Sequence, residues 1–162
     1  MALAFRTALL SERDELERVW RAAFTPFVRA LGRDLPAHGS AEFAAGLARV
    51  EAELQRGDVY VALDADHIVG LVRTERQKDE LYIDQIAVDP VRQRSGVGSW
   101  LLQRVEEVAR SASARGLLLE TPEMMEHLIR LYRRHGFEIV RRGPPAHGMD
   151  AHIRVFMEKT FT

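Results

Sequence analysis

The chain contains no cysteine among its 162 residues. Disulfide bridges, thiolate metal sites and cysteine nucleophiles are therefore excluded. An excess of positive charge is missing as well, because 23 lysines and arginines face 24 acidic residues and the net charge is −1. The electrostatic footprint of a nucleic-acid binder is thus absent, and we expect no nucleic-acid partner.

The chain also lacks a long apolar run. No segment approaches the roughly 20 uncharged apolar residues that a membrane span needs. The first residues run into Arg6 without the apolar segment of a signal peptide, so we expect a cytoplasmic protein without membrane contact. With 46% hydrophobic residues and no repeat or linker, the sequence predicts one domain over residues 1–162 with a core of its own.

The N-terminal region begins with a weak strand pattern at residues 5–8. Ser11 followed by Asp14 resembles a capping box that opens a helix. The helical spacing of apolar residues continues to Pro26. We expect the proline to end or kink this helix near Phe24.

A second helix is predicted between Ser40, a favourable N-cap residue, and Gly57, a favourable stop. The period then changes to β-branched and apolar residues at 59–63, 68–74 and 81–88, separated by polar turns. These three segments predict an antiparallel meander.

The C-terminal half alternates helices and strands. A helix is expected from Val97 to Gly116, and the apolar run of Leu117, Leu118 and Leu119 predicts a covered strand over 117–121, parallel to the one that ends at Val88. The remaining pattern predicts a helix at 122–135 and two strands, 137–140 and 153–157. In total the sequence predicts an α/β protein of the α+β kind, with about seven strands and about four helices.

The turn between the third meander strand and the long helix, residues 88–99, is the segment most suggestive of chemistry. The first N–H groups of a helix lack internal partners and attract anions. Glycines let a ligand approach the backbone, while arginine and serine side chains add donors. The residues of this kind are Arg92, Arg94, Ser95, Gly96, Gly98 and Ser99. Taken alone, Gly-x-Gly equally fits a tight turn, and the segment matches neither the Walker loop nor the dinucleotide fingerprint.

The same turn resembles the acetyl-CoA signature of the GCN5-related N-acetyltransferase (GNAT) family, Gln/Arg-x-x-Gly-x-Gly/Ala after a strand that ends in Val-x-Pro. Here the pattern is filled by Val88, Pro90, Gln93, Gly96 and Gly98. A second family element, a helix that bears tyrosine and ends in Gly-Phe, is present at residues 131–137, and the order of elements matches along nearly the whole chain.

The resemblance implies a mixed, mainly antiparallel sheet whose two central parallel strands splay apart, with acetyl-CoA as the cosubstrate between them. The implied cofactor-binding residues are Ile86, Ala87, Val88, Gln93, Arg94, Ser95, Gly96, Val97, Gly98 and Ser99. The strand residues would pair with the pantetheine arm through their backbone, and the turn would hold the diphosphate.

The resemblance also implies direct attack of an amine on the thioester in a ternary complex. Tyr132 would be the acid that protonates the departing thiolate, although a tyrosine here can also merely pack against the cofactor. Asp84 is the favoured base, and Glu120 or a water relay is the alternative. One departure concerns Met124 and Met125, which stand where many relatives carry an asparagine, so we expect no asparagine contact with the cofactor.

Two further clusters remain open. His147, Asp150 and His152 lie in one loop without the spacing of a zinc motif, so we expect no metal. Arg133 and Arg134 could reach the 3′-phosphate of coenzyme A, but cations are common at a helix C-terminus.

The function indicated by the resemblance is acetyl-CoA-dependent N-acetylation of a primary amine on an unidentified small molecule. The alternatives are a catalytically silent acyl-CoA-binding or sensor module and a protein N-acetyltransferase. Relatives commonly form homodimers, but the sequence specifies no interface.

Overall fold

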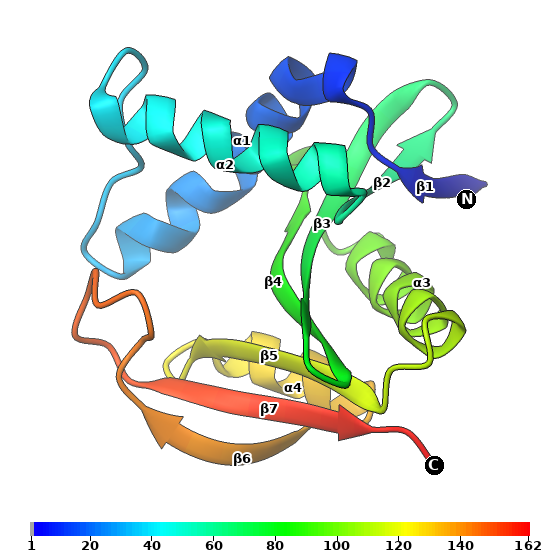
Figure 1. Ribbon diagram of the computed structural model, residues 1–162. Helices are drawn as coiled ribbons and strands as arrows, with labels where there is room; N and C mark the ends of the chain where they lie inside the picture. The colour runs from blue at the N-terminus through cyan, green and yellow to red at the C-terminus, as the bar shows by residue number, and fades with distance from the viewer. Residues whose placement is uncertain (1) are drawn as a thin grey trace. The chain divides into compact units, whose positions relative to one another are not determined.

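Seven strands and four α-helices make up the computed structural model, which describes residues 2–162 (Figure 1). The strands are β1 Leu3–Thr7, β2 Val59–Asp64, β3 His67–Gln77, β4 Glu80–Val88, β5 Gly116–Pro122, β6 Glu138–Gly143 and β7 Arg154–Thr160. The helices are α1 Arg13–Ala30, α2 Ala41–Arg56, α3 Val97–Ser111 and α4 Glu126–Arg134, with single 3-10 turns η1 Leu10–Glu12 and η2 Pro90–Arg92.

The strands pair in the order β1-β2-β3-β4-β5-β7-β6. The pairs β1–β2, β2–β3, β5–β7 and β6–β7 are antiparallel, whereas β4 and β5 are parallel through Leu81 opposite Leu117 and Tyr82 opposite Leu118. The predicted mixed, mainly antiparallel sheet with one parallel pair is therefore confirmed. In the part of the chain that the structure describes, no helix combines the length and apolarity that crossing a bilayer demands.

Contacts divide the chain into two compact units. The first unit contains residues 1–73 and 85–101, and the second contains residues 74–84 and 102–162. Strands β3 and β4 and helix α3 contribute residues to both units. The expectation of one domain over residues 1–162 stays a prediction.

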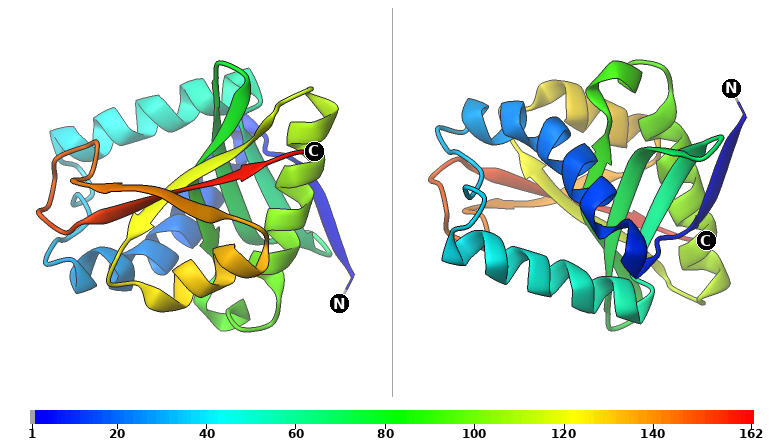
Figure 2. Two further views of the ribbon diagram at one scale, coloured as in Figure 1. Left: turned by 90° about the horizontal axis from the view of Figure 1, so that it is seen from below. Right: turned by 90° about the horizontal axis from the view of Figure 1, so that it is seen from above.

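The core of the first unit lies between α1, α2 and the strands β2 and β3, and Figure 2 shows both helices over these strands. Val19 of α1 and Val61 of β2 are wholly buried in it. The predicted ends of α2 are confirmed: Ser40 Oγ accepts a hydrogen bond from the N–H of Phe43 at 3.1 Å, and Gly57 ends the helix with φ +76°. A left-handed residue after the last turn is the usual role of glycine at a helix end.

The expectation that Pro26 ends or kinks α1 near Phe24 is wrong, because the helix continues to Ala30. A proline removes one backbone donor from the helix. The helical turn before Pro26 contains an additional side-chain hydrogen bond, because Thr25 Oγ1 donates to the carbonyl of Arg21 at 2.7 Å. Val28 is buried beyond the proline, so packing of the last turn compensates for the lost hydrogen bond.

The predicted capping box at Ser11 is also wrong. Residues 10–12 form the 3-10 turn η1, and α1 starts at Arg13. The side chain of Glu12 caps this segment instead, because its carboxylate accepts a hydrogen bond from the N–H of Leu9 at 2.8 Å and forms an ion pair with Arg6 at 2.6 Å. A strand residue from earlier in the chain thus fixes the helix entry.

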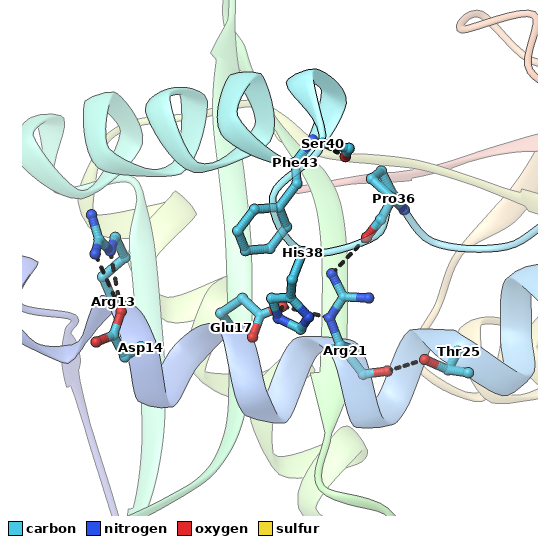
Figure 3. A network of polar contacts seen from close by, with 9 residues as sticks. All are labelled: Arg13, Asp14, Glu17, Arg21, Thr25, Pro36, His38, Ser40 and Phe43. Atoms are coloured by element: carbon cyan, nitrogen blue, oxygen red, sulfur yellow. Dashed lines mark hydrogen bonds and ion pairs between the residues drawn. The ribbon is translucent and has the colours of Figure 1, made fainter.

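The loop between α1 and α2 is tied to α1 by a polar network (Figure 3). Arg21 donates to the carbonyl of Pro36 at 2.9 Å and to Glu17 at 2.6 Å. His38 lies 3.5 Å from the same glutamate, and its ring packs 4.7 Å from that of Phe43. This loop is therefore held at both helices rather than only at its ends.

The second unit is built on β5, β7 and β6, with β7 between the other two (Figure 1). Two predicted boundaries are wrong here. Helix α3 ends at Ser111, followed by Ser113 in the left-handed region, while Gly116 begins β5 against the backbone of Lys159. Helix α4 begins at Glu126, because Pro122 still pairs with Arg154 in the β5–β7 register. The stop of α4 before Gly136, with φ +90°, agrees with the sequence.

Candidate functional site

The turn that connects β4 to α3 is held in shape by its own side chains. The Asp89 carboxylate accepts from the N–H of Val91 at 3.2 Å, and Gln93 Nε2 donates to the carbonyl of Val88 at 3.1 Å. Two residues then adopt positive φ, Arg94 at +63° and Gly96 at +89°. This left-handed step turns the chain into the first turn of α3.

The turn leaves space beside the amides that open α3. A Cβ built at Gly96 meets nothing within 4 Å, and one built at Gly98 meets only a methyl of Val88, at 4.0 Å. Residues 93–96 are exposed. Because the first N–H groups of a helix lack intrahelical acceptors, this open approach fits an anion such as a diphosphate.

The two arginines of the turn differ in their partners. Arg92 lies 2.6 Å from the carboxylate of Asp64 and is neutralised by it. Arg94 is exposed, and among residues 2–162 it forms no ion pair. Ser95, expected to offer a hydroxyl donor, instead donates to the carbonyl of Arg92. The free positive charge of this turn therefore belongs to Arg94.

The end of β4 offers backbone rather than side chains. Ala87 is 1% exposed and its methyl group lies in the core of the first unit. Its carbonyl packs 3.2 Å from the Cβ position of Gly70. Val97, also 1% exposed, likewise presents only its N–H. Of the expected cofactor contacts, those of Ala87 and Val97 are thus restricted to main-chain groups.

The two candidate bases, Asp84 and Glu120, both belong to the second unit and both act on the tyrosine at position 82. Both Glu120 and Asp84 raise the pKa of Tyr82 electrostatically, after the larger effect of burial. Burial raises the pKa of Glu120 as well, and Arg154 opposes this while Asp84 adds to it. A carboxyl whose pKa is raised toward neutrality is suited to general base catalysis.

Arg154 anchors the loop before β7. This arginine is 3% exposed and binds Asp150 through two hydrogen bonds of 3.0 Å, while Glu120 lies farther away at 4.0 Å. His147 Nδ1 accepts from the N–H of Met149 at 2.9 Å. Asp150 is therefore committed to Arg154. Within residues 2–162 no group of three or more metal-ligating side chains occurs.

Tyr132 lies on α4 with its ring edge-on to Phe137, 5.9 Å between centroids. Burial raises the pKa of Tyr132 to about 12. The phenol therefore keeps its proton throughout the neutral range. Its hydroxyl has no hydrogen-bond partner in the described residues, so the proton is available to a ligand.

A buried polar network in the first unit was missed by sequence reasoning. Arg73 and Glu53 are 6% and 5% exposed and pair through bonds of 3.0 and 2.6 Å. Gln85 of β4 joins them. The signal in the sequence is weak: Glu53 directly precedes Leu54 on the apolar face of α2, and Arg73 ends the apolar stretch of β3.

A comparison with family models matches residues 15–137 to the acetyltransferase (GNAT) family. The chain belongs to this family, and the resemblance found in its motifs is confirmed.

Among curated proteins, an IAA acetyltransferase from Azospirillum brasilense is 38% identical over 78 residues, which are 48% of this chain and 49% of that protein. The match therefore spans about half the length of that relative. Among solved structures, the PaiA N-acetyltransferase from Thermoplasma acidophilum in complex with coenzyme A has a TM-score of 0.78 at 14% identity, covering 99% of this chain and 100% of that one. Ard1 from Thermoplasma volcanium has a TM-score of 0.77 at 23% identity, covering 100% of this chain and 99% of that one. These structural likenesses show a shared fold.

Proposed function

We propose that this chain, acting as one catalytic domain, is an acetyl-CoA-dependent N-acetyltransferase that modifies a primary amine of a small molecule by direct attack in a ternary complex. The observation that carries the proposal is the open, left-handed entry to α3 at Gly96, with residues 93–96 exposed and the free charge of Arg94 beside it. Coenzyme A bound to the Thermoplasma acidophilum relative supports the same ligand here.

The residues of the turn divide the binding of the diphosphate between them. Main-chain N–H groups from Gly96 to Ser99 donate to its oxygens, and Arg94 adds a charge-assisted bond. Gln93 and Ser95 shape the turn. The amide N–H of Gln93 donates to the carbonyl of Val88, and the hydroxyl of Ser95 donates to the carbonyl of Arg92. The backbone of Ile86 to Val88 extends to the pantetheine arm as an added strand would.

Bound acetyl-CoA supplies an activated acetyl group, so the protein needs no nucleophile of its own. Glu120 accepts the proton that the attacking amine must lose, because its raised pKa gives it basicity closer to neutral pH. Asp84 acts through Glu120 by raising that pKa. Tyr132 donates a hydrogen bond toward the departing sulfur.

The pKa of about 12 limits how readily Tyr132 can transfer its proton. A phenol with this pKa is always protonated at neutral pH, but it gives up its proton less readily than an ordinary tyrosine. Its contribution is therefore a hydrogen bond to the thiolate that strengthens as negative charge develops on sulfur.

The test combines binding with turnover. Calorimetry with acetyl-CoA is expected to show binding to the intact chain, and a thiol assay over a panel of amines is expected to show release of coenzyme A with at least one of them. Binding without turnover on any amine would favour a silent acyl-CoA module. Turnover on lysine-containing peptides alone would favour protein acetylation, and failure to bind would refute the proposal.

A further inference from the structure

The side chain of Gln85 receives two hydrogen bonds on the same oxygen. Trp20 Nε1 of α1 donates to Gln85 Oε1 at 2.6 Å, and an Nη1 donor of Arg73 reaches the same atom at 2.8 Å. All three residues belong to the first unit. Indole and guanidinium groups are donors only, so the atom that faces them must be the amide oxygen.

This arrangement removes the usual ambiguity of a glutamine amide. Rotating the amide by half a turn would place its NH₂ group against two other donors and would lose both bonds. Arg73 cannot follow such a rotation, because its other nitrogens hold the buried carboxylate of Glu53 at 3.0 and 2.6 Å. The Gln85 amide is thus oriented by a buried ion pair and an indole.

The opposite end of the amide is unused. Gln85 Nε2 has no hydrogen-bond partner in the described part of the chain, and it is not among the buried polar atoms that lack one. Gln85 is only partly buried. Two N–H donors of fixed direction are therefore accessible to a ligand.

These donors lie on one particular face of the strands. Leu71 of β3 packs in the core with α1 and α2, whereas the Cβ position of the preceding Gly70 meets Val97 and Leu101 of α3. Neighbouring strand residues face opposite sides. Arg73 has the parity of Leu71, and Gln85 reaches Arg73 and α1, so its amide is on the face opposite the start of α3.

The position along β4 is equally specific. Gln85 directly precedes the Ile86 to Val88 backbone that the proposed function assigns to the pantetheine arm. Strand residues rise only about 3.3 Å each, so the amide is within side-chain reach of that backbone. A group that approaches the thioester from the face of α1 and α2 passes these donors.

We propose that Gln85 is the residue that recognises the acceptor, and that the acceptor is a primary amine carrying a neutral carbonyl oxygen close to the amine, as in an amino-acid amide. This inference rests on the proposed function and names its substrate class. The two N–H groups of Gln85 cannot accept a hydrogen bond from an ammonium group, so their partner on the acceptor must be an oxygen.

The surroundings favour a neutral oxygen over a carboxylate. The charge of Arg73 is already paired with Glu53. The neighbouring wall on α1 is aromatic, with Trp20 stacked 5.6 Å from Phe24 and Phe24 edge-on to Phe27 at 5.4 Å. A carboxylate is recognised best by an unpaired cation, whereas an amide carbonyl needs only neutral donors.

The experiment uses Gln85→Glu, which keeps an acceptor oxygen for Trp20 and Arg73 but removes the NH₂ donors. Three matched pairs of amines serve as probes: phenylalaninamide and 2-phenylethylamine, leucinamide and isopentylamine, and alaninamide and ethylamine. For the intact chain, kcat/KM is expected to be higher for each amide than for its partner. In Gln85→Glu, kcat/KM is expected to fall about tenfold for the amides, the effect of one lost hydrogen bond, and little for the plain amines.

Trp20→Phe is the second variant. It removes one of the two bonds that orient the amide and keeps the aromatic ring, so the preference for amides is expected to shrink without disappearing. Acetyl-CoA affinity is measured for both variants and is expected to match that of the intact chain, and a cooperative unfolding transition shows that each variant is folded.

Three results would overturn the inference. One is an equal loss for amides and plain amines in Gln85→Glu, which would place the donors on the acetyl carbonyl. Another is preferential turnover of the plain amines, and the third is no turnover of any amide. In each case retained binding of acetyl-CoA, or turnover of other amines, leaves the proposed function standing, whereas loss of acetyl-CoA binding by the intact chain refutes that function instead.

Discussion

The guanidinium group of Arg92 lies 2.6 Å from the carboxylate of Asp64, and this ion pair distinguishes the two arginines of the turn before α3. Arg92 joins the turn to the end of β2, whereas Arg94 is exposed. A sequence motif that contains both residues therefore holds one paired cation and one exposed cation, and the proposed function assigns the exposed one to acetyl-CoA.

Replacement of the exposed Arg94 should weaken acetyl-CoA binding. We expect Arg94→Ala to lower the affinity about fivefold, equivalent to one exposed charge interaction of about 1 kcal/mol. The effect should shrink at high salt because exposed charges are screened. Calorimetry at two salt concentrations measures this. Arg92→Ala is the control, and equal losses in both variants would contradict the division of roles.

Replacing Gly96 by alanine should distinguish the cost of backbone strain from the loss of acetyl-CoA binding. Gly96 and Gly57 have φ of +89° and +76°, and in each case an added Cβ meets nothing within 4 Å. We expect alanine at either position to lower the free energy of unfolding by about 1–2 kcal/mol, the cost of the left-handed region. Acetyl-CoA affinity should fall about tenfold only for Gly96→Ala, through one disturbed bond to the diphosphate. Equal affinities for the two variants would exclude the turn as the anion site.

The raised pKa of Glu120 predicts the pH dependence of both activity and stability. We expect kcat/KM to fall as the pH drops through a pKa above the ordinary glutamate value, because the base becomes protonated. Glu120→Gln should lower kcat about 100-fold and abolish this acidic limb of the pH profile, that is, the fall of kcat/KM at low pH. Asp84→Asn should keep the limb but move it to lower pH, since the charge of Asp84 helps to raise the pKa of Glu120. If Asp84→Asn abolishes the limb instead, Asp84 is the base.

Stability should change in the opposite sense. The folded protein binds the Glu120 proton more tightly than the unfolded chain does, because burial raises the pKa. This contribution to the free energy of unfolding is present below the unfolded pKa and is lost as the pH rises through the folded pKa. Urea denaturation across this range should show the loss in the intact chain and not in Glu120→Gln.

Removal of the Tyr132 hydroxyl should affect turnover without affecting the fold. The hydroxyl has no partner in residues 2–162, so Tyr132→Phe should change the free energy of unfolding by less than about 0.5 kcal/mol. We expect kcat to fall at least about tenfold while KM for acetyl-CoA stays similar, because a hydrogen bond that strengthens on the developing thiolate is lost. Tyr60→Phe, on β2, serves as the control. An unchanged kcat in Tyr132→Phe would mean that the ring only packs.

The buried pair of Arg73 and Glu53 should be costly to break from one side. Glu53→Ala leaves an uncompensated buried guanidinium group and should lower the free energy of unfolding by about 3–5 kcal/mol. The double variant Glu53→Leu with Arg73→Met should recover most of this loss, because apolar residues of similar volume replace the pair. Urea denaturation of both variants tests the expectation, and equal destabilisation would argue against a charge effect.

Local features of this fold could be read from the sequence. Ser40 and Gly57 mark the ends of α2, and Gly96 marks the left-handed entry to α3, because caps and positive φ depend on residues within about one helical turn. The change of period from four-residue to two-residue spacing likewise identified the meander. The order of strands and helices, and the family, follow from such short-range signals.

Contacts between distant segments were decided only by the tertiary structure. Pro26 remains inside α1 because Val28 packs beyond it, and Pro122 remains in β5 because Arg154 pairs with it. The bond between Trp20 and Gln85 joins residues 65 positions apart. No local pattern encodes such a pair, since each partner is chosen by the packing of whole elements rather than by its neighbours in the chain. The amide direction at Gln85 therefore became visible only once α1, β3 and β4 were in place.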